Sequence, residues 1–387
     1  MDTTLTNSST INSEAGDCAV GGGGCEKTGG KKRRFVSVLI MIVGLLAGII
    51  VIFFADRLLM PKYATSIFEG SLIAEYYSSE KDHQLLIIGD CEVYENISTI
   101  TLWKDYGITS FIRGSPQQLM WQSYYLLEDA LKYETPETVL FSVYAMKYPV
   151  PQSEAYNRLT LDGMRFSLSK INSVNASMTD SEDFVSYFLP LLRFHERWKE
   201  LSSEDFQYLF SKRDVSFSGF TVRSDIMPLG RLPTPVAPGD LEFADVCWEY
   251  LEKARLLCES RGIEFVLFKA PVLHPHWFDE WDEQIVAYAR THGLKYINAL
   301  DVSDDIGLDF STDTYNGGLH LNVWGAEKMA AYLGEVLTES GSRLGGLRSD
   351  LETSLIWDAK AEEYEALKAR QLAEIEEFGK VMTLVRG

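Results

Sequence analysis

The chain has 387 residues, which is enough for one large domain or two of ordinary size. A hydrophobic content of 46% fits a folded core, and 56 Asp and Glu against 36 Lys and Arg give a net charge of −20. This acidic balance argues against a nucleic-acid partner, because binding to the phosphate backbone requires a basic surface.

The N-terminal part of the chain predicts a membrane anchor. Residues 1–34, rich in Ser, Thr and Gly, are interpreted as a disordered tail, and residues 35–55 form an uncharged apolar run of 21 residues. At about 1.5 Å per residue this run crosses the hydrocarbon core of about 30 Å. The alternative is a cleaved signal peptide, whose apolar region would be only about 7–15 residues long and would precede a small-residue cleavage site.

The basic stretch KKRR before the apolar run sets the expected orientation. By the positive-inside rule, the tail is cytoplasmic and the rest of the chain lies outside the cell. We therefore expect a single-pass plasma-membrane protein, with residues 56–80 as a linker to the main domain.

Beyond the linker, short apolar runs alternate with helical patterns. Buried strands are expected at 84–88, 109–113, 138–144, 263–270 and 295–300, and helices at 94–106, 117–133, 241–261, 279–291 and 323–338. This alternation predicts an α/β domain, a parallel sheet sandwiched by helices. The domain covers residues 81–345 with a helical insertion at about 150–240, and residues 346–387 form an amphipathic helix that packs on the domain or on a partner.

Three residues with possible chemical roles fall where predicted strands end or the last helix begins. Cys91 follows the first strand in LLIIGDCEVYEN, Gly114 ends the second, and His320 lies in TYNGGLHLNVWGAEKMA. Because the carboxyl ends of parallel strands form the crevice of an open sheet, we expect all three on one rim. Asp90 is expected to cap the helix after the first strand. A buried apolar filler is the alternative role for Cys91.

These blocks resemble the SGNH/GDSL hydrolase family. IIGDCEV matches its nucleophile block, RGSP its second block, and GLHLNVWGAEKM its histidine block. The chain is most similar to membrane-anchored members that act on cell-envelope polymers, including proteins similar to the D-alanyl transfer protein of teichoic acid synthesis. The resemblance implies a flavodoxin-like (SGNH-type) sheet, Cys91 as nucleophile, His320 as base, and an oxyanion hole made of the backbone N–H groups of Cys91 and Gly114.

Two positions depart from the pattern of that family. Cys91 stands where the family has Ser, and Gly317 stands where the family has the Asp that orients the histidine. Asn316, four residues before His320, is the expected orienter, and Asp313 is a second candidate. A cysteine can ionise before the reaction and form a thiolate–imidazolium pair, which an Asn orients without adding negative charge.

Several further residues are candidates for substrate contacts. Trp277 and Trp281, after the fourth strand, are interpreted as a platform for a sugar ring or an acyl chain. Lys147 and Arg223 could hold an anionic group or lie in solvated surface, and Asn157 is a candidate for the family's missing oxyanion Asn. The spacing of His, Cys, Asp and Glu predicts no metal site, and no cofactor is expected.

The leading hypothesis is a membrane-anchored, extracytoplasmic acyl hydrolase or O-acyltransferase. Its substrate would be a cell-envelope polysaccharide or a teichoic-acid-like polymer. The alternative is a catalytically degenerate subunit that binds the polymer or assists a multi-spanning membrane acyltransferase. A flavodoxin-like nucleotide binder is disfavoured, because no Gly-rich phosphate loop follows the first strand.

Overall fold

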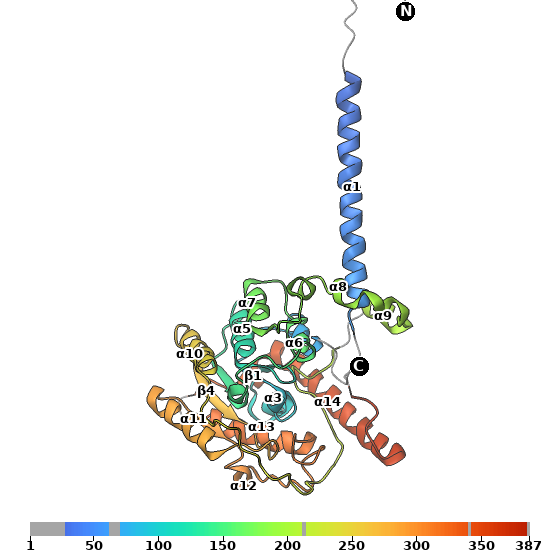
Figure 1. Ribbon diagram of the computed structural model, residues 1–387. Helices are drawn as coiled ribbons and strands as arrows, with labels where there is room; N and C mark the ends of the chain where they lie inside the picture. Colours follow the sequence, from blue (N-terminus) through green and yellow to red (C-terminus); the bar gives the residue numbers. More distant parts are fainter. Residues whose placement is uncertain (1–27, 62–69, 211–213, 340–341, 385–387) are drawn as a thin grey trace, which may run out of the picture. The chain divides into compact units, whose positions relative to one another are not determined.

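The computed structural model describes residues 28–61, 70–210, 214–339 and 342–384 (Figure 1). The chain divides into two compact units, residues 1–53 and 54–387. Helix α1, Thr28–Leu59, fills the described part of the first unit and ends in the second. By length and composition Arg34–Leu59 could span a membrane, a test that a signal sequence also passes. Residues 1–27 of the expected tail lie outside the described residues, and residues 28–34 are helical rather than disordered.

A parallel five-stranded sheet forms the centre of the second unit. Its strands are β1 (Leu85–Gly89), β2 (Ser110–Gly114), β3 (Thr138–Ser142), β4 (Glu264–Lys269) and β5 (Tyr296–Asn298). The strand order is β2-β1-β3-β4-β5 and each neighbouring pair is parallel. This is the flavodoxin-like order, in which the crevice forms at the carboxyl ends of β1 and β3. The α/β fold expected from the sequence is therefore confirmed.

Helices cover both faces of the sheet, so successive side chains of a strand enter different cores. In β1, Leu85 and Ile87 belong to one core, and Leu86 and Ile88 belong to the other. The first core is covered by α3 (Cys91–Tyr94), α4 (Thr99–Thr101), the π-helix η1 (Leu102–Tyr106), α12 (Ser303–Ile306), α13 (Val323–Leu337), η5 (Leu347–Ser349) and α14 (Leu351–Phe378). The second is covered by α5 (Met120–Ala130), η2 (Tyr144–Lys147), α10 (Asp245–Glu259) and α11 (Asp279–His292). Burial on both faces explains why the strands are continuous apolar runs.

The insertion between β3 and β4 is helical in its first part. Its elements are α6 (Glu154–Leu161), α7 (Leu168–Ser177), η3 (Phe184–Tyr187), α8 (Leu191–Phe194), η4 (His195–Lys199) and α9 (Ser203–Phe210). Leu161, Val174 and Tyr187 form a small core with Leu126 of α5 and with Ile73 of α2 (Ser71–Glu75). This small core attaches the insertion to the main domain.

The C-terminal helix α14 packs on the main domain. Trp357 and Tyr364 are buried in the first core, and Gln371 is fully buried. The side chain of Gln371 donates to the carbonyl of Val222 at 3.0 Å and accepts the backbone N–H of Ser224 at 3.0 Å. The helix thus covers residues 218–224, the segment that lies along the free edge of β2.

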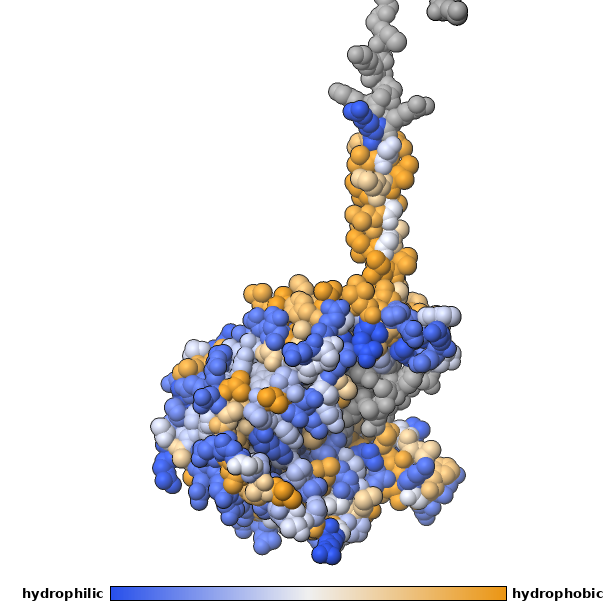
Figure 2. Space-filling view, in the orientation of Figure 1, coloured by the Kyte–Doolittle hydropathy of each residue, from blue (hydrophilic) through white to orange (hydrophobic). Residues whose placement is uncertain are grey.

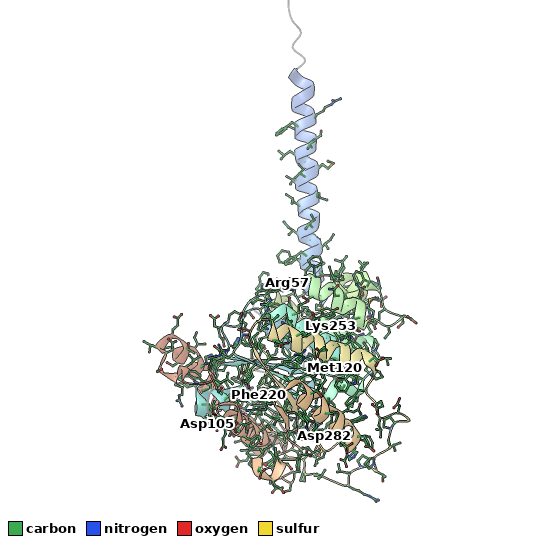
Figure 3. The ribbon with its side chains drawn as sticks, turned by 90° about the vertical axis from the view of Figure 1, so that its left-hand side faces the viewer. Arg57, Asp105, Met120, Phe220, Lys253 and Asp282 are labelled. Atoms are coloured by element: carbon green, nitrogen blue, oxygen red, sulfur yellow. The ribbon has the colours of Figure 1, made fainter. Side chains whose placement is uncertain are left out.

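That segment protects an edge strand from water and from other chains. The backbone N–H of Ile112 in β2 donates to the carbonyl of Ser218 at 2.9 Å, so part of the open edge is paired. Phe220, labelled in Figure 3, is fully buried, and its ring lies 6.2 Å from that of Tyr364 in α14. Gly219 permits this approach, because its φ is +91° and a Cβ there would lie 2.1 Å from the carbonyl oxygen of Ile112.

We expect Gly219→Ala to lower the free energy of unfolding by about 2 kcal/mol or more, because the added methyl group meets backbone and the left-handed conformation is strained. Urea denaturation of the purified full-length chain measures the change. The control is Gly230→Ala, at an open position where no positive φ is imposed, which should shift stability by no more than about 0.5 kcal/mol. Equal losses in the two variants would contradict this account of the edge.

Candidate active site

Cys91 is the first residue of α3, at the carboxyl end of β1. The carboxylate of Asp90 accepts the backbone N–H of Glu92 at 3.0 Å, so Asp90 caps the helix as the sequence predicts. Gly89 brings β1 close to β3, since a Cβ there would lie 2.5 Å from the Cβ of Ser142. The sulfur atom is thus carried on a sharp strand-to-helix turn, and Cys91 as a whole residue is half-buried.

His320 is held by two partners at the same ring nitrogen. Its Nδ1 lies 2.9 Å from the Oε2 of Glu95 and 2.8 Å from the Nδ2 of Asn316. Nδ1 carries one hydrogen, and a carboxylate is the stronger acceptor, so the ring N–H donates to Glu95. Asn316 instead fixes the loop, because its Oδ1 accepts the backbone N–H of His320 at 2.7 Å.

Glu95 therefore occupies the place that the sequence assigned to Asn316 or Asp313. The carboxylate of Asp313 is engaged elsewhere, 2.6 Å from the Nζ of Lys328. Glu95 was missed because the helix was expected to begin near residue 94. A helix that begins at Cys91 places Glu95 one turn after the cysteine, on the same face.

Tyr315 and Arg223 support the pair of Glu95 and His320. The hydroxyl of Tyr315 donates to Glu95, and the Tyr315 ring stacks on the imidazole with centroids 6.1 Å apart. The guanidinium of Arg223 lies 4.5 Å from the centre of the Tyr315 ring and 2.8 Å from the carboxylate of Asp225. Arg223 is thus already paired, which leaves it poorly suited to hold an anionic substrate.

The charges of the pair stabilise each other. Burial lowers the pKa of His320, but the carboxylate of Glu95, helped by those of Asp90 and Glu92, outweighs burial, and the net pKa is raised. Burial likewise raises the pKa of Glu95, but the charge and hydrogen bond of His320, the hydroxyl of Tyr315 and the charge of Arg223 together outweigh it, and the net pKa is lowered. Glu95 is therefore ionised at neutral pH, ready to stabilise an imidazolium.

The surroundings of Cys91 disfavour a thiolate. Burial raises the pKa of its thiol well above the ordinary value, and the nearby carboxylates of Asp90, Glu95 and Glu92 raise it further. Among the described residues, no hydrogen bond joins its Sγ to His320. The resting thiolate–imidazolium pair therefore gains no support from this geometry and stays a prediction.

A buried ion pair fixes α3 against the end of β4. The carboxylate of Glu92 lies 3.1 Å from the Nζ of Lys269, and both side chains are almost fully buried. Lys269 also donates to the carbonyl of Ala270 at 2.6 Å, and the N–H of Ala270 donates back to Glu92. These bonds connect two strand ends across the rim of the sheet.

Lys147 supplies a second buried ammonium after β3. Within the described part of the chain its Nζ has no hydrogen-bond partner, and it lies 3.2 Å from the centre of the Tyr144 ring. Burial lowers the pKa of Lys147 to about 8, although Glu92 and Asp90 act in the opposite direction. Lys147 also lies within electrostatic range of Cys91. It is therefore a cation with unused donors at the edge of the site.

An apolar pocket of about 630 Å³ adjoins Lys147. Its walls are Lys147, Tyr148, residues 232–238, Leu273 to His276, Phe278 and Trp281. Trp277 and Trp281 are only 5% and 7% exposed and pack around Phe243. They form part of the core rather than an open platform, although Trp281 reaches the pocket wall.

The loop after β2 influences the thiol of Cys91. The backbone N–H of Gln117 acts to lower the pKa of that thiol, against the larger effect of burial, and Gln117 has a φ of +50°. Pro116 in second position, a positive φ in third and the N–H of Gln118 bonded to the carbonyl of Ser115 at 3.2 Å describe a type II turn. That third position usually takes Gly, so a non-Gly residue there marks stored strain beside a candidate site.

The two expected oxyanion candidates outside Cys91 are placed differently. Gly114 is the last residue of β2, in register with Gly89, and a Cβ there would lie 3.1 Å from the Tyr94 ring. Asn157 lies in the insertion, where its amide donates to the carbonyl of Ser177 at 2.7 Å. Its donors are thus used within the insertion, and the role of Gly114 stays a prediction.

Comparison with known proteins adds little to this geometry. No family model matches the chain, and no curated protein matches it. A lipolytic protein of the G-D-S-L family from Desulfitobacterium hafniense has 13% identity and a TM-score of 0.35, over 66% of this chain and 100% of that one. An acylhydrolase from Bacteroides fragilis has 9% identity and a TM-score of 0.34, over 68% of this chain and 93% of that one. A GDSL-like lipase from Bacteroides thetaiotaomicron has 11% identity and a TM-score of 0.32, over 69% of this chain and 98% of that one. Similarity this low carries no argument about activity.

Replacing the carboxylate of Glu95 should remove the negative charge that stabilises the protonated imidazole of His320. We expect Glu95→Gln to lower the pKa of His320, which NMR titration of the imidazole measures. The raised pKa of His320 gives stability that is complete below 6.5 and is lost as pH rises. The lowered pKa of Glu95 gives stability that is complete above 4.5 and is lost as pH falls.

The stability lost in Glu95→Gln should therefore be largest between these two ordinary values, 4.5 and 6.5. Glu283→Gln, which changes an exposed carboxylate of α11, is the control and should leave the His320 titration unchanged. An unaltered His320 pKa in Glu95→Gln would show that the carboxylate does not hold the ring.

Proposed function

We propose that this protein is an acyl-transferring enzyme with Cys91 as nucleophile and His320 as base. The observation that supports it most is the arrangement of His320 against Glu95, one helical turn from a cysteine at the carboxyl end of β1. An imidazole oriented by a carboxylate beside a nucleophile is the arrangement that acyl transfer requires.

The first half of the proposed reaction forms a thioester. His320 takes the proton of the Cys91 thiol as Sγ attacks the carbonyl carbon of an ester, and Glu95 stabilises the resulting imidazolium. The N–H of Gln117 and the ammonium of Lys147 stabilise the negative oxygen of the tetrahedral intermediate. Collapse breaks the bond to the leaving alcohol, which receives the proton from His320.

The second half of the proposed reaction regenerates the free thiol of Cys91. His320 removes a proton from water or from an acceptor hydroxyl, which attacks the thioester, and the thiol leaves with the proton. Water gives a hydrolase and a hydroxyl gives an O-acyltransferase. The apolar pocket beside Lys147 would exclude bulk water from one reactant, an arrangement that suits either outcome.

The proposed substrate is an acylated polymer of the cell envelope, a polysaccharide or a teichoic-acid-like polymer. The candidate span Arg34–Leu59 supports this choice, because an uncleaved anchor would keep the enzyme at the membrane surface. The proposed location is the outer side of the plasma membrane, with the N-terminus in the cytoplasm.

A non-catalytic role is the second candidate function. The raised pKa of Cys91, and the lack of a hydrogen bond from its Sγ to His320 among described residues, favour an inactive site. In this case the chain would bind envelope polymer or assist a multi-spanning membrane acyltransferase. Formation of an acyl-enzyme separates the two functions.

We expect p-nitrophenyl acetate to transfer one acetyl group to Cys91, detected on the full-length chain by mass spectrometry of its peptides. Cys91→Ala should carry no label, and His320→Ala should acylate at least about 100-fold more slowly, because the base is lost. Cys258→Ala changes a buried thiol on α10 and should behave as wild type. No acylation of Cys91, or the same slow rate without His320, would favour the non-catalytic role.

Lys147 should control the alkaline side of the pH profile. The ammonium form declines as pH rises past about 8, so kcat should fall there in the wild type. Lys147→Met should lower kcat by about 100-fold at neutral pH with little change in KM, and should remove the alkaline limb. Lys253→Met, at an exposed position of α10, is the control. An unchanged alkaline limb in Lys147→Met would exclude the ammonium as its cause.

A further inference from the structure

The end of α1 is held by the insertion through backbone and side-chain hydrogen bonds. The backbone N–H of Leu191 in α8 donates to the carboxylate of Asp56 at 2.7 Å. The guanidinium of Arg197 in η4 donates to the carbonyls of Leu59 and Met60 at 3.0 and 2.8 Å. Within the second unit, the residues that follow the apolar run are therefore fixed to α8 and η4, close to the labelled Arg57 (Figure 3).

The same part of the insertion exposes large apolar side chains. We define the apolar face as Phe166, Leu168, Val185, Leu192, Trp198 and Phe210, which are between 48% and 84% exposed. Figure 2 shows orange surface over α7 and α8, next to the end of α1. Contacts join these elements, since the Phe166 ring packs on Phe188 after η3, and the salt bridge of Arg197 with Asp205 joins η4 to α9.

A soluble surface does not usually gather such side chains. Contiguous exposed apolar patches mark sites that meet another apolar surface. Two of the exposed side chains, Phe206 and Phe210, lie one turn apart on α9, so this short helix presents an apolar stripe. Trp198 has an amphipathic ring of the kind that accumulates at the boundary between headgroups and acyl chains.

We infer that the apolar face docks on the lipid bilayer, at the boundary between headgroups and acyl chains. This inference rests on the membrane anchor of the proposed function. If Arg34–Leu59 spans the membrane, the hydrogen bonds to Asp56, Leu59 and Met60 hold α8 and η4 at the bilayer surface. Lipid then covers the apolar face without any other protein.

The charges around the apolar face fit uncharged lipid. The basic side chains of residues 191–200 are Arg193, Arg197 and Lys199, and each is paired with a carboxylate, Arg197 with that of Asp205 at 3.1 Å. Arg193 is paired with Glu154 at 2.8 Å and Lys199 with Glu196 at 3.5 Å. Docking should therefore depend on burial of apolar surface and not on anionic headgroups.

Trp198 provides a native probe for this docking. Trp198 is 65% exposed, while the other seven tryptophans are buried or half-buried. The experiment uses the full-length chain in phosphatidylcholine vesicles, with and without lipids brominated near the headgroup. The emission of Trp198 is the difference between wild type and Trp198→Phe. We expect this difference signal to be blue-shifted and reduced at least two-fold by brominated lipid, whereas the emission of Trp198→Phe should change little.

The control adds a tryptophan away from the apolar face. Leu256→Trp in the Trp198→Phe background places an indole at an exposed position of α10 and should not be quenched. If the chain resists alkaline carbonate extraction but the Trp198 signal is unquenched and water-like, the docking inference is wrong and the proposed membrane anchor still holds. If carbonate extracts the chain from the vesicles, both the anchor and the docking inference are wrong. Neither result depends on acyl transfer, so the proposed chemistry is tested separately.

Discussion

The structure around the candidate site is governed by three acidic residues of one short helix, of which Asp90 and Glu92 are buried and Glu95 is largely buried. Asp90, Glu92 and Glu95 span barely more than a turn, and desolvated carboxylates are costly unless each finds a partner. Glu92 forms an ion pair with Lys269 at the end of β4, and Glu95 pairs with His320, which precedes α13. Asp90 accepts a backbone N–H at the helix start. Charge compensation therefore draws distant parts of the chain to the carboxyl ends of β1 and β4.

This arrangement also sets the chemistry that the site can support. The carboxylates that raise the pKa of His320 also raise the pKa of Cys91, which favours a thiol one helical turn from the Glu95 that holds the imidazole. In the proposed reaction, proton transfer to His320 would then accompany attack by the thiol, as it does for a serine nucleophile. Lys147, in η2 after β3, offsets part of the negative charge of Glu92 and Asp90. The site thus resembles a carboxylate-assisted pair in its electrostatics, although its nucleophile is sulfur.

The helical insertion connects the main domain to the end of α1. Its own small core attaches it to α5, while two of its exposed apolar side chains, Leu192 and Trp198, lie on α8 and η4, which bind the end of α1. A docked insertion would fix the height of the crevice above the bilayer. An envelope polymer could then be reached only within a limited distance of the membrane surface.

The sequence by itself determined the order of strands and helices, because buried parallel strands are continuous apolar runs and their helices keep the 3.6-residue period. It also identified Asp90 as a cap and located Cys91 and His320 near one rim. Tertiary structure alone decided the partner of His320. Asn316 and Asp313 were proposed from their spacing along the chain, whereas Glu95 reaches the ring through space, 225 residues away in sequence. The pKa of Cys91 was likewise decided by folding, since it depends on burial and on the carboxylates that folding brings close, which spacing along a chain does not encode.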